Sequence, residues 1–249
     1  MPHSTDKEYG ERAIPQYEHA VALAGGDPVR IPLDRSDTDV RKLIEHCDGV
    51  LLPGSNADVD PARFRQERST HTAAADPRRD EVDDLLLEDA YAQRKPVLGI
   101  CYGLQSLNVF RKGSLIQHIP DFLPDATRTK VNHEAGKKVA IAHTVEIEPA
   151  SLLARIVSDN DPVWRPDARG PVVVPVNSSH HQSADAIGDG LRIVARSPDD
   201  GIIEGLEGTS KNHFVIAVQW HPERSVERDE PSLAIFKALI EAAAKRNGG

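Results

Sequence analysis

One cysteine of this chain lies in a setting suited to nucleophilic chemistry. Cys101 sits in PVLGICYGLQSL, between an apolar segment typical of a buried strand and a segment typical of a helix, with Gly99 and Gly103 on either side. This Gly-x-Cys-x-Gly pattern is the cysteine form of the nucleophile elbow, in which glycines permit a tight strand-to-helix turn. Because a helix N-terminus favours the thiolate over the thiol, we predict that Cys101 is a nucleophile.

The alternative for Cys101 is the ordinary role of a free cysteine, a small buried apolar side chain. We expect that role for Cys47, which lies in EHCDGV without flanking signals of an elbow. Two cysteines do not form a disulfide framework, so we expect both to be free thiols.

A thiolate that attacks an amide needs an imidazole to protonate the leaving amine, and the imidazole needs a carboxylate to fix its tautomer. The segment VQWHPE supplies both groups, His221 and Glu223, at the end of an apolar strand. Residues two apart on a strand lie on one face, so the two side chains are predicted to be neighbours. The alternative for His221 is an ordinary surface histidine after a strand, and the alternative for Glu223 is an ordinary solvated charge.

The same elbow predicts donors for an oxyanion. The backbone N–H of Tyr102 follows the nucleophile, and a second donor is expected from the turn of Gly54 and Ser55, which ends a neighbouring strand.

These residues must be positioned by a sheet whose strands and helices alternate along the chain. The pattern from about residue 13 to 120 predicts an α/β fold with a single open, mostly parallel sheet and helices on both faces. Turn residues separate the last strands of the chain, which predicts a C-terminal antiparallel meander. Residues 1–12 are expected to be a polar N-terminal tail and residues 13–249 a single domain. One helix is expected to begin at Pro15, and further helices are expected over 37–46, 77–95 and 232–246. Strands are expected over 29–33, 49–53, 96–100, 172–176, 191–197, 201–207 and 213–220.

A long segment without clear periodicity, residues 54–76, interrupts this alternation. Such long loops inside compact domains are usually functional, so it is a candidate lid.

The combination of GICYGLQ and VQWHPE resembles the class I glutamine amidotransferase-like family, over the chain from about Ile14 to the final helix. GSNADVDPARF, DPRRDEVDDLLLEDA, LNVFRKGSLIQHIP and VNSSHHQSAD are similar to its stand-alone γ-glutamyl hydrolase branch, which includes γ-glutamyl-γ-aminobutyrate hydrolases. The resemblance implies a flavodoxin-like fold, with Cys101 as nucleophile, His221 as base and then acid, and Glu223 as the orienting carboxylate. It also implies a substrate-binding set that faces the glutamyl group: Gln105, Ser178, Ser179, His180, His181 and Gln182.

Two features depart from that family's pattern. The family begins with a strand ahead of the first helix, and residues 1–12 contain no apolar run that could form it. This leaves three alternatives: the sheet closes around the missing strand, another chain supplies a strand at this position, or the protein begins upstream of residue 1. Ser55 stands where the branch commonly has glycine, and Tyr102 stands where it often has arginine. Both changes leave the backbone N–H donors in place. A tyrosine cannot attract an anionic leaving amine by charge as an arginine could, so the expected preference for a leaving amine changes.

Composition limits the partners. The net charge of −9 and the pI near 5.6 argue against nucleic acid, and no apolar run approaches the roughly 18 residues of a membrane helix. The polar start of the chain lacks a signal peptide, so we expect a cytoplasmic protein, with homo-oligomerisation possible. No cofactor or metal is expected: zinc at His180 and His181 would need a Cys or carboxylate at a metal-like spacing beside them.

The predicted function is therefore a cysteine-dependent hydrolase that cleaves the γ-glutamyl amide bond of a small compound through a thioester. The alternatives are a glutaminase subunit that supplies ammonia to a synthase, and a catalytically idle binding protein of the same fold.

Overall fold

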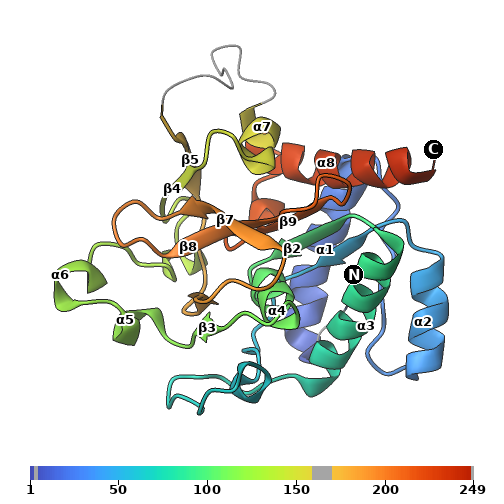
Figure 1. Ribbon diagram of the computed structural model, residues 1–249, viewed down its shortest axis with the longest axis horizontal. Coiled ribbons are helices and arrows are strands. Elements are labelled where there is room, and N and C mark those ends of the chain that lie inside the picture. Colours follow the sequence, from blue (N-terminus) through green and yellow to red (C-terminus); the bar gives the residue numbers. More distant parts are fainter. Residues whose placement is uncertain (3–4, 159–169, 248–249) are drawn as a thin grey trace.

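The computed structural model describes residues 1–2, 5–158 and 170–247. Its centre is a seven-stranded sheet in the order β1-β2-β9-β8-β7-β4-β5, beside which a two-stranded sheet pairs β3 with β6 (Figure 1). The strands of the large sheet are β1 (Val50–Leu52), β2 (Val97–Ile100), β4 (His143–Ile147), β5 (Val172–Val176), β7 (Leu191–Arg196), β8 (Ile203–Gly208) and β9 (Val215–Val218); β3 is Leu115–Ile116 and β6 is Ser183–Ala184.

The large sheet is parallel at one side and antiparallel at the other. Strands β1, β2 and β9 are parallel, and every residue in them is buried, as expected for strands covered on both faces. From β9 outward the pairs β9–β8, β8–β7, β7–β4 and β4–β5 are antiparallel. The predicted α/β fold with an open sheet, helices on both faces and a C-terminal antiparallel meander is confirmed. The sheet is mixed and not mostly parallel, because only the pairs β1–β2 and β2–β9 are parallel.

Helices cover both faces of the parallel strands (Figure 1). One hydrophobic core joins α1 and α8 to β2 and β9, and a second joins α2, α3 and α4 to the opposite face. None of the described helices combines the length and the apolar character needed to cross a membrane. The helices are α1 (Lys7–Leu23), α2 (Asp37–Glu45), α3 (Pro77–Gln93), α4 (Tyr102–Phe110), α5 (Ile119–Phe122), α6 (Asp125–Arg128), α7 (Leu152–Ser158) and α8 (Glu230–Asn247), with short 3-10 turns at Pro61–Phe64, Ala135–Lys137 and Pro222–Arg224.

The N-terminal region differs from the expectation of a polar tail over residues 1–12. Helix α1 begins at Lys7, and the side chain of Asp6 caps it by accepting a hydrogen bond from the N–H of Tyr9. The expected start of this helix at Pro15 is wrong: the helix continues through Pro15, which it tolerates as an interior residue. Pro15 lies on the exposed face, where the carbonyl that loses its partner can bond to water.

The strand expected over residues 29–33 is also wrong. Ile31 forms an isolated parallel bridge with Pro2, and its N–H donates to the carbonyl of Met1 at 2.8 Å. Met1 is buried in the core that contains Leu51 of β1. Among the described residues, this bridge is the β-structure that precedes β1.

Candidate active site

Cys101 occupies the turn between β2 and α4. Its backbone has φ 53° and ψ −105°, a strained conformation for a residue with a side chain. The N–H of Cys101 donates to the carbonyl of Val218 at 2.8 Å, which fixes the turn to β9. The side chain is 6% exposed, at the N-terminus of α4.

The two glycines beside Cys101 are required by close backbone contacts. A Cβ on Gly103 would lie 2.1 Å from the carbonyl oxygen of Leu52, and a Cβ on Gly99 would lie 2.7 Å from the carbonyl oxygen of Gly103. Neither obstacle is a flexible side chain, so neither can move aside cheaply. The steric reason given for the Gly-x-Cys-x-Gly pattern is confirmed.

The chain brings His221 and Glu223 to this turn from the end of β9. Nδ1 of His221 donates to Oε1 of Glu223 at 2.8 Å, and the His221 side chain also hydrogen-bonds to Cys101. Burial lowers the pKa of His221, but the charges and hydrogen bonds of Glu223 and Cys101 outweigh it and raise that pKa to about 9. The imidazole is therefore protonated at neutral pH and can give a proton to a leaving group.

Two residues that sequence reasoning missed hold the imidazole in place. The side chain of Asn177 donates to the carbonyl of His221 at 3.0 Å and accepts from its N–H at 3.2 Å. The hydroxyl of Tyr17 lies 3.5 Å from Nδ1 of His221 and accepts from the N–H of Gly54 at 3.0 Å. Tyr17 belongs to the buried face of α1, where no local signal separates it from core residues.

The loop after β1 lies against the imidazole. A Cβ on Gly54 would be 3.1 Å from Cε1 of His221. The N–H of Gly54 is engaged by Tyr17, so of the two loop residues Ser55 is the better candidate for an oxyanion donor. Tyr102 is the first residue of α4, ahead of the first intrahelical hydrogen bond, so its N–H is available by position.

A buried arginine connects the loop after β1 to the start of α4. Arg79 on α3 is fully buried and donates to Asp83 at 2.7 Å and to the carbonyl of Pro53 at 2.6 Å. Its guanidinium also lies 4.9 Å from the ring centroid of Tyr102, whose hydroxyl donates to Asp80. Arg79 therefore positions the loop after β1 and the first residue of α4, and the Tyr102 side chain faces the core.

Replacing Arg79 by methionine is expected to lower the free energy of unfolding by about 3–5 kcal/mol, because Asp83 would remain buried without its partner. Urea unfolding measures the change. Arg41→Met is the control, since its pair with Glu88 is about half exposed and is worth about 0–1 kcal/mol. Adding Asp83→Leu to Arg79→Met should recover stability; equal losses in the Arg79 and Arg41 variants would contradict this role.

The expected glutamyl-side residues are brought together in part. The side-chain amide of Gln105 donates to the carbonyl of Gln182 at 3.3 Å, and Ser179 accepts from Arg224 at 2.7 Å. Ser178 is buried and its carbonyl accepts from the N–H of Gly136 at 2.6 Å.

The two histidines of this segment take different directions. Nε2 of His181 contacts Asp58 at 3.1 Å, which joins the segment to the candidate lid. Nε2 of His180 instead lies 3.4 Å from Glu204 on β8. His180 therefore belongs to a different group of side chains, described below.

The candidate lid, residues 54–76, is anchored at several points. Besides the contact between Asp58 and His181, Arg63 pairs with Asp80 at 2.7 Å, and the Gln117 side chain accepts from the N–H of Ser69 at 2.8 Å. A role as a lid stays a prediction.

An open α/β sheet with a cysteine elbow, a histidine and a glutamate at its edge is the arrangement of class I glutamine amidotransferase-like proteins. The chain belongs to the Peptidase C26 family, whose model matches residues 2–223. It is 31% identical to the γ-glutamyl-γ-aminobutyrate hydrolase of Escherichia coli (strain K12), over 91% of this chain and 84% of that protein. It is also 33% identical to a protein of Rickettsia prowazekii (strain Madrid E) named for its likeness to glutamine amidotransferases, over 91% of this chain and 87% of the other.

Solved structures support the fold. The glutaminase domain of a Trypanosoma brucei CTPS superposes with a TM-score of 0.59 and 15% identity, covering 98% of this chain and 92% of that domain. The resemblance to the γ-glutamyl-γ-aminobutyrate hydrolase branch is thus confirmed, and family membership supports a hydrolase.

Proposed function

We propose that the protein hydrolyses the γ-glutamyl amide bond of a small γ-glutamyl compound through a thioester on Cys101. The observation that carries the proposal is the buried chain of contacts from Cys101 to His221 to Glu223 at a strained elbow. The hydrolase activity in the name of the Escherichia coli relative supports the choice of substrate class.

In the first half of the reaction, the Cys101 thiolate attacks the γ-carbonyl carbon and forms a C–S bond, while the carbonyl electron pair moves to oxygen. The N–H groups of Ser55 and Tyr102 stabilise this oxyanion. The imidazolium of His221 then gives its proton to the amide nitrogen, the C–N bond breaks and the amine leaves. Glu223 holds Nδ1 of His221, so Nε2 is the nitrogen that serves the reaction.

In the second half, the neutral imidazole accepts a proton from water, and the resulting hydroxide attacks the thioester carbon. The C–S bond breaks, and the pair of thiolate and imidazolium is restored. Glutamate leaves with a new γ-carboxyl group, which loses its proton to solvent. Gln105, Ser178, Ser179, His181 and Gln182 would bind the α-ammonium and α-carboxylate of the glutamyl group, which need fixed polar partners. His180 is not among them, because its side chain faces Glu204.

A panel of γ-glutamyl amides tests the proposal. Purified protein should release glutamate from γ-glutamyl-γ-aminobutyrate and from the uncharged analogue γ-glutamyl-butylamine, without a partner. The Tyr102 side chain faces the core and offers no positive charge to the carboxylate of the leaving amine. We therefore expect similar kcat/KM values for these two substrates, whose leaving amines differ in that carboxylate. An acid-quenched reaction should contain protein heavier by one γ-glutamyl group, detected by mass spectrometry.

Other outcomes would replace the proposal. Glutamine hydrolysis that starts only when a synthase is added would indicate the glutaminase subunit. No turnover of any amide, together with no γ-glutamyl adduct, would indicate a catalytically idle binding protein.

A further inference from the structure

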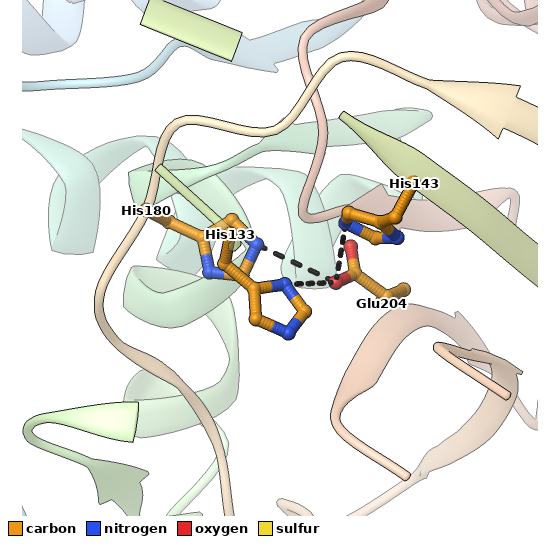
Figure 2. A group of neighbouring side chains, drawn as sticks. All are labelled: His133, His143, His180 and Glu204. Carbon is orange, nitrogen blue, oxygen red and sulfur yellow. Dashed lines mark ion pairs between the residues drawn. The ribbon is translucent and has the colours of Figure 1, made fainter. Parts of the chain in front are cut away.

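A second group of buried titratable side chains takes no part in the proposed reaction. It consists of His133 in the turn after α6, His143 at the start of β4, His180 between β5 and β6, and Glu204 on β8. Figure 2 shows the three imidazole rings arranged around the carboxylate, with dashed lines converging on one of its oxygens. These residues come from four separate parts of the chain.

The three distances from Glu204 match the edges of a tetrahedral metal site. From Oε1 of Glu204, Nδ1 of His133 lies at 3.1 Å, Nε2 of His180 at 3.4 Å and Nε2 of His143 at 3.5 Å. Nitrogen and oxygen ligands about 2.0–2.1 Å from a tetrahedral zinc ion lie about 3.3 Å from one another. All four ligand atoms fall within 4.8 Å of one another. Apart from the ion pairs that the histidines make with Glu204, these four atoms have no hydrogen-bond partner among the described residues.

The outer nitrogen of each ring has an oxygen partner. A carbonyl or carboxylate oxygen only accepts, so the outer nitrogen carries the ring proton and the inner nitrogen of a neutral ring carries a lone pair. Metal-binding histidines are held in this way by a second shell of acceptors. The outer pairs are Nε2 of His133 with Asp200 at 2.9 Å, Nδ1 of His143 with the carbonyl of Thr144 at 2.9 Å, and Nδ1 of His180 with the carbonyl of Gln182 at 2.8 Å.

We propose that His133, His143, His180 and Glu204 bind a divalent transition-metal ion, with zinc as the expected occupant. The three inner nitrogens face one carboxylate oxygen, and a cation between the four ligands would replace these ion pairs by coordination. Imidazole and carboxylate ligands in tetrahedral geometry suit zinc.

The ion would have a structural role, because four protein ligands fill its coordination shell. It would join β4 and β8 to the loop that carries His180. The carbonyl of Gln182 accepts from both His180 and Gln105, so the metal would fix the polar segment beside helix α4.

The sequence expectation of no metal considered His180 with His181. The structure pairs His181 with Asp58 instead, and supplies the other ligands from distant positions. No local spacing could have predicted them.

The test measures metal directly in protein that carries Cys101→Ala, so that the thiol cannot bind zinc and no activity is needed. After incubation with zinc and gel filtration, elemental analysis should find close to one zinc per chain. Dipicolinate should remove it and lower the Tm, and zinc should restore the Tm. Cobalt should give the intense visible absorption of a four-coordinate site.

Variants locate the site. Glu204→Gln and His143→Ala should abolish stoichiometric binding, and Asp200→Asn should weaken it about 10–100-fold by loss of a second-shell acceptor. His213→Ala is the control, because Nε2 of this partly buried histidine donates to the carbonyl of Lys95 outside the cluster, and its loss should leave binding unchanged.

The proposal is overturned if the Cys101→Ala protein takes up neither zinc nor cobalt, or if folded Glu204→Gln and His143→Ala proteins still bind one ion per chain. If both variants fail to fold, the cobalt spectrum of the Cys101→Ala protein decides, since imidazole and carboxylate ligation lacks the charge-transfer band of a thiolate. These outcomes are independent of the γ-glutamyl assays.

Discussion

Replacing Cys101 by alanine is expected to lower kcat for γ-glutamyl hydrolysis by about 10⁶-fold. Loss of a nucleophile that acts as a unit with its base removes nearly all the catalysis that the unit provides, and only binding and oxyanion stabilisation remain. Glutamate release from γ-glutamyl-γ-aminobutyrate, measured under saturating substrate, gives the comparison. The γ-glutamyl adduct should disappear from the acid-quenched protein.

The natural control is the other cysteine. Cys47 is partly exposed and its thiol donates to the carbonyl of Leu43 at 3.3 Å. Cys47→Ala should retain the wild-type kcat and the adduct. Wild-type turnover by a correctly folded Cys101→Ala protein would exclude the thioester mechanism, whatever the substrate.

The elbow could be predicted from the sequence because both of its glycines flank the cysteine closely along the chain, although one of the contacts that require them is with another strand. The contact between Gly103 and Leu52 leaves no room for a Cβ, and the contact between Gly99 and Gly103 adds the same restriction at Gly99, two residues before Cys101. His221 and Glu223 could be predicted as neighbours because they are two residues apart, but the strand periodicity used for this does not apply. Strand β9 ends at Val218, and Glu223 lies in the 3-10 turn Pro222–Arg224.

The residues that hold the site together could not be predicted in this way. Arg79 lies among other charged residues of α3 in the sequence, and its burial depends on Asp83 and on the carbonyl of Pro53, which belongs to another element. Tyr17 and Asn177 act on His221 across 204 and 44 residues of chain. Contacts of this kind depend on the assembled sheet.

The N-terminal helix illustrates a different limit. Proline is favoured at the first position of a helix, so the sequence favoured a start at Pro15. The competing signal is the cap at Asp6, whose side chain accepts from the N–H of Tyr9. This cap was readable in the sequence, but the polar character of residues 7–12 obscured it.

Replacing Glu223 by glutamine is expected to lower kcat/KM by about 10⁴-fold, because an amide can hold the imidazole in the wrong tautomer and cannot stabilise its charge. It should also change the pH profile. In the wild-type protein the pKa of about 9 keeps His221 protonated below that pH, so activity should fall as the pH rises through about 9. Without the negative charge of Glu223, burial lowers the pKa of His221, and the alkaline limb should move to lower pH.

The pH dependence of stability should change in the same variant. A folded pKa of about 9 lies above the value of about 6.5 for an unperturbed histidine, so the pair of His221 and Glu223 stabilises the fold fully below about pH 6.5. That contribution is lost as the pH rises through about 9, and urea unfolding should show a larger loss in the wild-type protein than in Glu223→Gln. A smaller loss remains in the variant, because the pKa of His133, although lowered by burial, is also raised to about 9 by Asp200 and Glu204. Glu227→Gln is the control, because Glu227 is exposed and pairs with exposed His19. An alkaline limb at the same pH in the Glu223 variant as in the Glu227 control would mean that Glu223 does not set the charge of His221.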